Sequence, residues 1–401
     1  MPNATSTNPN FDPGPGRFAA SVGELDRDSW NRANRGGGPF ADHRFLGALE
    51  ASGCLGPGTG WSPCPLVDER ADAFAALPAY LKSHSRGEFV FDWAWARASE
   101  GAGIPWYPKL LVASPFTPVT GTRLLGAEAH PELAAGLIGR IERTVEQRGY
   151  SSAAINFCDP VDARLLQDAG WLARRDWQFH WTNPGYRDFD DFLDSLKRKP
   201  RKNIRRERRL AREAGWSFDW LDGGRLDADT LEFIYQCYRA TFLRYGNWPA
   251  LNAAFFRRVA ADFADRFLVC VAKRHGRPQA SAVFWRDGTR LYGRYWGSLA
   301  ETRDAHFEAC YYQGIEYCIR EGLQAFEPGA QGEYKIRRGF LPVATRSFHY
   351  IRHPGLKAGI RRWLKMEARA LDDYRRLLDE MNPFAPSHRL APANPARANL
   401  V

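Results

Sequence analysis

The chain has 401 residues, of which 44% are hydrophobic and 25% charged. This length exceeds what one hydrophobic core usually serves, so we expect two domains of a folded, soluble protein. No window approaches 18 consecutive apolar residues, and the start lacks the charged-then-apolar order of a signal peptide, which argues against a membrane-spanning or secreted chain. We therefore expect a cytoplasmic location.

The seven cysteines include no CxxC pair. An odd number without such spacing argues against both a disulfide framework and a zinc site. We expect buried free thiols and no bound metal.

The net charge of +10 comes almost entirely from one segment. Between Lys197 and Arg212 the sequence KRKPRKNIRRERRLAR carries ten Lys or Arg against one Glu. Such a run fits a tRNA backbone, the phosphates of a coenzyme or nucleotide-linked precursor, or an anionic membrane surface. The candidate contacts are Lys202, Asn203, Arg205 and Arg206, and a solvated basic helix is the plain alternative.

Both ends of the chain are rich in Pro and Asn, and we expect disordered tails over 1–20 and 385–401. The first half then shows helical patterns from about 22 to 53 and strands at 61–67 and 73–81. A short helix in FDWAWARASEGAG and a strand in WYPKLLVAS follow.

The stretch from Pro115 to Trp171 reads as a strand, a Gly/Thr loop, a long amphipathic helix, a strand, a short helix and a Gly-aromatic pair. This order resembles the core of the GNAT acyltransferases. In that core the loop before the long helix binds a pyrophosphate, because helix N-termini carry free N–H groups. Thr117, Thr120 and Arg123 fall in this loop, which lacks the usual GNAT signature. Together with Asp92 and Lys109 they form a candidate pocket for the donor or the acceptor. The equal alternative is that these side chains make only structural hydrogen bonds.

The second half repeats the plan of the first. Residues 155–181 align without a gap with residues 169 positions further on, so that Gly170-Trp171-Leu172 matches Gly339-Phe340-Leu341, and Phe179-His180-Trp181 matches Phe348-His349-Tyr350. Helices of similar length precede both copies. We interpret the match as a real internal repeat.

Five blocks of the sequence resemble the FemAB-like family of predicted N-acyltransferases, which is labelled as peptidoglycan biosynthesis or recognition. They are FDWAWARASEGAGIPWYPKLLVASPFTPVTGTRLL, SLKRKPRKNIRRERRLAREAG, LYGRYWGS, HFEACYYQGIEYCIREGLQ and FEPGAQGEYKIRRGF. The resemblance spans about residues 20–385.

The resemblance implies an α/β (α+β) fold with two tandem GNAT-like domains, each a mixed sheet flanked by helices. We expect these domains over 21–195 and 216–355, with a basic linker helix over 196–215 and a C-terminal helix over 356–384. The implied activity is transfer of an acyl or aminoacyl group to an amine acceptor, such as a cell-wall precursor. The implied donor is acyl-CoA, or alternatively aminoacyl-tRNA, with no covalently bound cofactor.

Amide formation needs a neutral amine, a site for the oxyanion and a proton for the leaving group, but no covalent nucleophile. The sequence agrees, since it lacks GxSxG, a P-loop and HExxH. His306-Phe307-Glu308 mimics the His-x-Glu of deaminases, but no Pro-Cys-x-x-Cys follows it to supply zinc ligands.

The catalytic candidates lie in FEPGAQGEYKIRRGF. The Fem relatives carry a Phe-Lys pair before the last strands, and Tyr334-Lys335 occupies the matching place, so Lys335 is expected at the reacting carbonyl. Glu327 or Glu333 is the expected base, with Gln331 and Arg338 as binding residues. Solvated loop charges are the alternative interpretation.

Two neighbouring segments supply further candidates for binding. Tyr292, Arg294 and Trp296 alternate on a predicted strand, and we expect them on one face along a substrate groove. His306, Glu308 and Tyr312 open the following helix, although His306 also suits a helix cap.

Two other classes of function stay open. A non-catalytic module that binds a peptidoglycan-type or phosphate-bearing ligand on a degenerate GNAT fold is favoured by the poor pyrophosphate loop of the first half. An RNA-binding protein rests on the basic run alone and predicts salt-dependent tRNA binding without transfer.

Overall fold

The structure is a computed structural model that describes residues 15–302, 304–330 and 332–388. Most of the two predicted tails, and Gln331, lie outside the described residues. The inner end of the first predicted tail is ordered, because Arg17–Phe18 (β1) pairs with Leu66 and Val67.

The N-terminal half follows the predicted order of elements. Its helices and strands are α1 (Arg27–Ala33), α2 (His43–Ala51), β2 (Trp61–Pro63), β3 (Leu66–Arg70), β4 (Ala73–Leu77), β5 (Ala79–Lys82), α3 (Trp93–Gly101), β6 (Lys109–Val112), α4 (Pro131–Arg148), β7 (Ser152–Ile155), α5 (Pro160–Asp168) and β8 (Leu172–Thr182).

In the structure, each of the strands predicted at 61–67 and 73–81 is divided into two strands. Each predicted run is interrupted by proline, at Pro63 with Pro65 and at Pro78, and proline cannot donate to a strand ladder. As a result, β3 and β4 leave the main sheet and form a three-stranded sheet with β1, while β2 and β5 stay in the main sheet.

The C-terminal half begins with the basic helix and ends with a long helix. Its elements are α6 (Phe189–Asp194), α7 (Arg198–Glu213), β9 (Trp216–Asp222), α8 (Ala228–Arg244), α9 (Ala253–Asp262), β10 (Phe267–Arg274), β11 (Arg277–Arg286), β12 (Arg290–Ser298), α10 (Ala305–Phe307), the π-helix η4 (Glu308–Tyr312), α11 (Gln313–Arg320), β13 (Ala325–Glu327), the 3-10 helix η5 (Glu333–Arg338), β14 (Leu341–Ile351) and α12 (Pro354–Glu380).

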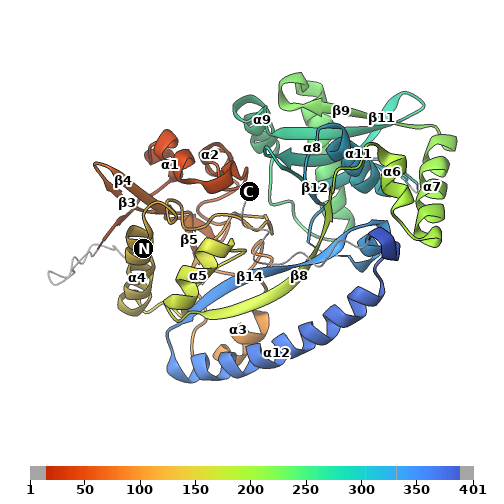
Figure 1. Ribbon diagram of the computed structural model, residues 1–401. Helices are drawn as coiled ribbons and strands as arrows, with labels where there is room; N and C mark the ends of the chain where they lie inside the picture. Colours follow the sequence, from red (N-terminus) through yellow and green to blue (C-terminus); the bar gives the residue numbers. More distant parts are fainter. Residues whose placement is uncertain (1–14, 303, 331, 389–401) are drawn as a thin grey trace.

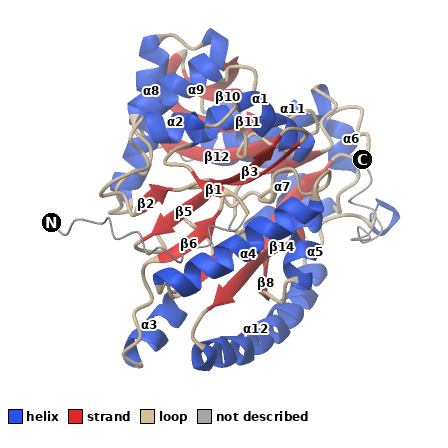
Figure 2. Cartoon of the chain, turned by 90° about the vertical axis from the view of Figure 1, so that its left-hand side faces the viewer, coloured by secondary structure: helices blue, strands red, loops and turns tan. Residues whose placement is uncertain are grey.

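One eleven-stranded sheet runs through both halves, in the order β2-β5-β6-β7-β14-β8-β13-β12-β11-β10-β9. The last strand of each half pairs with the other half, because β14 lies between β7 and β8 while β8 also pairs with β13. Figure 1 shows β8 and β14 crossing between the two halves, with α12 beneath them. Figure 2 shows helices packed around this sheet.

The two exchanged strands are the two copies of the repeat. They pair antiparallel about Asp176 and Thr345, which are themselves 169 residues apart. Gly170 and Gly339, two residues before each strand, both have positive φ, at 74° and 94°. Glycine adopts this conformation without steric cost, which explains its presence at both positions.

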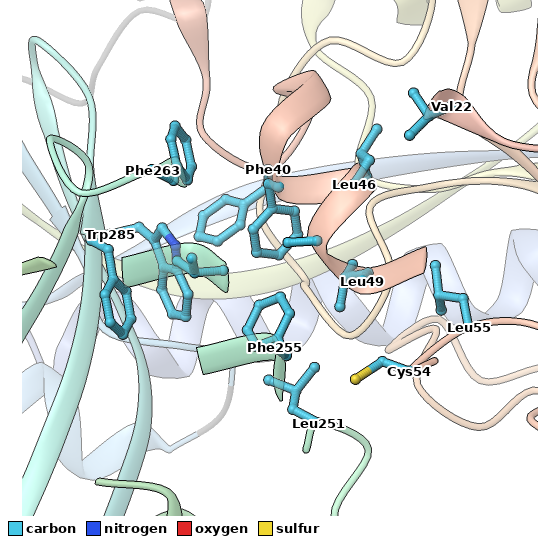
Figure 3. Packing of buried hydrophobic residues seen from close by; sticks show 14 of the residues in the cluster. Val22, Phe40, Leu46, Leu49, Cys54, Leu55, Leu251, Phe255, Phe263 and Trp285 are labelled. Carbon is cyan, nitrogen blue, oxygen red and sulfur yellow. The ribbon is translucent and has the colours of Figure 1, made fainter. Parts of the chain in front are cut away.

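The hydrophobic cluster shown in Figure 3 is a core shared by the two halves. Phe40 and Phe45 from the N-terminal half pack against Trp285, with ring centroids 5.7 and 6.0 Å apart, and Phe45 also packs against Phe255 at 5.8 Å. Figure 3 shows this packing, in which Leu46 and Leu49 of α2 face the same cluster. Among the described residues, no helix is long and apolar enough to cross a membrane.

Because the core is shared, Phe255→Ala is expected to destabilise both halves together. Truncating a fully buried phenylalanine costs about 3–5 kcal/mol. In urea denaturation, the midpoints from fluorescence and from far-UV circular dichroism should fall by the same amount. Leu377→Ala, at a side chain that is 58% exposed, is the control and should change stability by less than about 0.5 kcal/mol. Two separate transitions, of which only one moves, would contradict a shared core.

Candidate active site

The parallel strands β12 and β13 separate in the middle of the sheet. They pair from Arg290 to Tyr292 on β12, and β13 ends at Glu327. Beyond this point β12 pairs only with β11, and the register shifts so that Arg294 is an extra residue, a β-bulge. A Cβ added at Gly293 would lie 3.4 Å from the Cα of Pro328, so glycine allows the backbones to stay close where the strands part.

Glu327 lies at this separation with one carboxylate oxygen free. Its side chain is buried, Oε1 accepts a hydrogen bond from Arg290 at 2.9 Å, and Oε2 has no hydrogen-bond partner. The nearest cationic candidate for Oε2 is Nε2 of His180 on β8, at 3.7 Å. An unpaired buried carboxylate oxygen is costly, which marks this position as one for a ligand or a transferred proton.

Arg294 reaches the same place from β12, and it is held by the N-terminal half. Its Nη2 donates to the carbonyl of Phe116 at 3.0 Å, and the rings of Phe40, Phe89 and Tyr295 lie about its guanidinium, with centroids 5.8–5.9 Å away. The buried Nε has no partner. The separated strands therefore present one unpaired N–H donor as well as one unpaired carboxylate oxygen.

Lys335 of η5 completes the group. The side chain is 2% exposed, and Nζ donates to the carbonyl of Gly329 at 2.8 Å, in the loop that follows β13. Burial lowers the pKa of Lys335 to about 7, with Arg294 adding to the effect. Burial likewise lowers the pKa of His180, although Glu327 opposes this shift. Near neutral pH, Lys335 therefore exists in both protonation states.

The bulge overturns the expected alternation along β12. Tyr292 stays on the side of Arg294, since both contact Phe40, but its ring is buried in the shared core, 5.3 Å from the ring of Phe40, and its hydroxyl donates to Asp287 at 2.6 Å. Trp296 faces another part of the molecule, where its ring lies 5.4 Å from His306. One extra residue shifts the register, so side chains on either side of it no longer share a face.

The other predicted residues of this region have structural partners. Glu333 is exposed and accepts a hydrogen bond from Tyr374 of α12. Glu308 is buried and pairs with Arg208 of α7 at 3.0 Å. His306 is half-buried, and burial lowers its pKa to about 4, which keeps it neutral.

Arg338 ties η5 to the basic helix. Its Nη2 pairs with Glu207 of α7 at 2.8 Å, its Nε donates to the hydroxyl of Tyr312 at 3.0 Å, and its Nη1 donates to the carbonyl of Tyr334 at 2.9 Å. The guanidinium also lies 3.6 Å from the ring centroid of Phe307. With every nitrogen engaged, Arg338 has a positioning role for the segment that carries Lys335.

The basic candidates lie on α7, away from the separated strands. Lys202, Arg205 and Arg206 are exposed. Asn203 faces a pocket of about 290 Å³ between α7 and η5. The structure therefore divides the predicted residues into a buried group at the strands and a second group along α7.

The predicted pyrophosphate loop of the first half is closed by its own side chains. Arg123 is 1% exposed, and its guanidinium donates to the carbonyls of Val119, Thr122 and Asn156. The N–H groups of Arg123 and Leu124 both donate to the carboxylate of Asp162. Since these donors are already paired, the geometry argues against a phosphate there; Thr117 is buried and Thr120 half-buried in the same loop.

The two other residues considered in the first half form an ion pair. Lys109 lies 2.5 Å from Asp92 and 2.7 Å from Glu88, and all three side chains are buried. The pair fixes the loop that carries Phe89 beside Arg294.

His180 is the residue that sequence reasoning missed as a site candidate. It stands in the Phe-His-Trp block that revealed the repeat, and its counterpart His349 lies beside Trp95 instead. The available signal was a histidine between two large aromatic residues, Phe179 and Trp181, at the end of the strand.

Comparisons with known proteins agree with this architecture. The family described as FemAB-like, peptidoglycan biosynthesis/recognition, matches residues 21–386. No curated protein matches the sequence.

Solved structures resemble the chain along most of its length. FemX is 12% identical, with a TM-score of 0.53, covering 86% of this chain and 99% of FemX. The C-terminal domain of a putative lysylphosphatidylglycerol synthetase from Agrobacterium fabrum is 11% identical, with a TM-score of 0.53 and coverage of 86% and 97%. A tandem GNAT protein from the clavulanic acid biosynthesis pathway is 12% identical, with a TM-score of 0.42 and coverage of 84% and 98%. The fold is that of FemX and of the synthetase domain, and the chain belongs to the FemAB-like family.

Proposed function

We propose that this protein transfers an acyl or aminoacyl group to an amine, and that the reaction takes place where β12 and β13 separate. The observation that carries the proposal is the buried group of Glu327, His180, Arg294 and Lys335 at this point. One carboxylate oxygen and one guanidinium N–H there have no partner. The unpaired carboxylate oxygen can accept the proton of a reacting amine, and the unpaired N–H can donate to the oxygen of a reacting carbonyl.

In the proposed reaction, the amine nitrogen attacks the carbonyl carbon of the donor. The amine must lose a proton as the new C–N bond forms, and Glu327 Oε2 is placed to accept it, directly or through neutral His180. Arg290 holds the other oxygen of the carboxylate and so fixes its orientation.

The oxyanion that develops on the carbonyl would be stabilised by the Arg294 Nε–H or by the Lys335 ammonium. As the bond to the leaving oxygen or sulfur breaks, Lys335 can supply the proton that the leaving group needs, because its pKa is lowered to about 7. The proton taken up by Glu327 then returns to solvent or to Lys335.

Direct attack of the amine on the donor needs no cysteine nucleophile, and the cysteines of this chain are not held in a nucleophilic form. Burial raises the pKa of all seven thiols, so none is held as a thiolate, the nucleophilic form. A covalent cysteine intermediate is therefore not part of the proposal.

We assign the chemistry to the C-terminal half. In the N-terminal half the corresponding loop is closed by Arg123 and Asp162. The N-terminal half contributes the loops of Phe89 and Phe116 that hold Arg294. A closed first domain also supports the alternative of a non-catalytic module that binds a peptidoglycan-type ligand, and transfer assays separate the two.

For the donor we propose acyl-CoA, with aminoacyl-tRNA as the alternative, in the cytoplasm where both are made. For the acceptor we propose an amine on a cell-wall precursor or related metabolite, in line with the family description.

Lys335→Met is expected to lower the transfer rate at least 100-fold, because one lost oxyanion donor typically costs this much. Glu327→Gln should lower it similarly, through loss of the proton acceptor. The measurement is transfer from acetyl-CoA, longer acyl-CoAs and aminoacyl-tRNA to amine acceptors, including a nucleotide-linked cell-wall precursor.

Glu100→Gln, at an exposed glutamate of α3, is the matched control and should retain full activity. Glu333→Gln tests the other candidate base, whose carboxylate is exposed and hydrogen-bonded to Tyr374. It should retain most of the activity. If the Glu333 variant is inactive while the Glu327 variant is not, the base has been assigned wrongly. If the wild-type protein transfers nothing from any donor yet binds the precursor, the binding module is the better description.

Stability should depend on pH through Lys335. Its pKa falls from 10.5 to about 7 on folding, so between these values the unfolded chain binds more protons and the free energy of unfolding rises with pH. The contribution of Lys335 to this rise is at most about 1.4 kcal/mol per pH unit, and Lys335→Met should remove it. Lys82, whose pKa burial also lowers to about 7, keeps its own contribution in the variant. Urea denaturation from pH 6 to pH 10 measures the slope.

Lys365→Met, at an exposed lysine, should leave that slope unchanged. Equal slopes for the wild-type protein and for Lys335→Met would show that Lys335 keeps an ordinary pKa in the folded state.

A further inference from the structure

The pocket between α7 and η5 lies outside the catalytic group described above. It has a volume of about 290 Å³ and is lined by Asn203, Ile204, Glu207, Tyr312, Glu333, Tyr334, Arg337, Arg338 and Met381. We propose that this pocket binds a phosphorylated nucleoside, with the base inside and the phosphate on the adjoining cations. The inference rests on the proposed function, because it identifies the carrier end of the donor.

The cations beside the pocket are free to bind phosphate. Lys199 and Arg206 lie four residues before and three residues after Asn203, hence on the same side of α7, and Arg337 lines the pocket itself. All three are exposed, and in the described part of the chain they form no ion pair. Other α7 arginines are engaged, such as Arg201 with Asp194 at 2.8 Å.

The interior of the pocket suits a flat, partly polar group. Ile204 and Met381 supply apolar surface, and the ring of Tyr334, 45% exposed, supplies a flat face. Asn203 forms no hydrogen bond within the described residues, so its amide has both a donor and an acceptor to offer. A base needs just this combination of a stacking face and an edge for hydrogen bonds.

The charges in and beside the pocket are positive on balance. Glu207, the acid nearest to the cations, is neutralised by Arg338 at 2.8 Å. Glu333 keeps its charge, because its hydrogen bond comes from the neutral hydroxyl of Tyr374. The three free cations Lys199, Arg206 and Arg337 outnumber this one carboxylate, so the net charge is positive, which favours phosphate over an amine or a metal ion.

The pocket is also coupled to Lys335. Tyr334 lines the pocket and is the residue before Lys335, and its carbonyl is held by Arg338. A ligand that packs on Tyr334 would therefore stabilise η5 and the position of the lysine. The same network of Glu207, Tyr312 and Arg338 borders the pocket and supports the catalytic segment.

Two donors share this chemistry, because coenzyme A and the 3′ end of tRNA both carry a phosphorylated adenosine. The test is isothermal titration calorimetry of the full chain at constant ionic strength, with ADP, adenosine, inorganic phosphate, coenzyme A and tRNA as probes. We expect ADP to bind at least ten times more tightly than adenosine or phosphate alone. Competition with ADP by coenzyme A or by tRNA identifies the source.

Arg337→Ala and Asn203→Leu should each weaken ADP binding at least ten-fold. Arg212→Ala, on the same helix beyond the pocket, should change it less than two-fold, and melting temperatures confirm that each variant folds. If ADP does not bind, the proposed nucleotide site is refuted. If Arg212→Ala weakens ADP binding as much as Arg337→Ala does, the nucleotide is attracted by the overall charge of the basic helix and not by the pocket.

The Glu327→Gln variant keeps this test separate from the proposed function. It should bind ADP as the wild-type protein does, since Glu327 ends β13 and does not line the pocket. Nucleotide binding without any acyl transfer would leave the pocket standing and refute the enzyme. Transfer that is unaffected by Arg337→Ala would leave the enzyme standing and refute the pocket as the donor's site.

Discussion

The pairing of β8 with β14 is the interaction on which the rest of the structure depends. Each strand ends one half of the chain, yet each pairs with a strand of the other half, so neither sheet is complete alone. This exchange places His180, which belongs to the first half by sequence, beside Glu327 of the second. It also aligns the two halves closely enough for a shared core to form between α2 and α9.

The candidate site consists of buried ionisable groups, whose burial lowers the stability of the fold and depends on the rigid scaffold that the two halves share. Lys335, Arg294 and Glu327 are ionisable side chains withdrawn from water, and each keeps only part of its hydrogen-bonding capacity satisfied. Such groups destabilise a fold unless their surroundings are rigid. The buried ion pair of Lys109 with Asp92 and Glu88 supplies part of that rigidity, because it fixes the loop of Phe89 against Arg294.

The two copies of the repeat have diverged in a way that explains the asymmetry of the protein. In the first copy the side chain of Arg123 fills the loop after β6, and Asp162 accepts a hydrogen bond from the backbone of that loop, which is therefore closed. In the second copy β12 and β13 remain apart at the bulge. Under the proposed function, the second half carries the chemistry and the first half holds the reacting groups in place.

The sequence by itself determined the order of elements, the internal repeat and the family, and it predicted Lys335 and either Glu327 or Glu333 as site residues. These follow from local periodicity and from motifs that are contiguous in the chain. Only the tertiary structure decided the exchange of β8 and β14, the bulge that turns Trp296 away from Tyr292 and Arg294, and the proximity of His180 to Glu327. The strand exchange arises from pairing between residues more than 140 positions apart, such as Trp181 with Phe326, and no local pattern encodes such pairing. The bulge lies between neighbouring strands, but the alternation of residue types along β12 does not show where the extra residue falls.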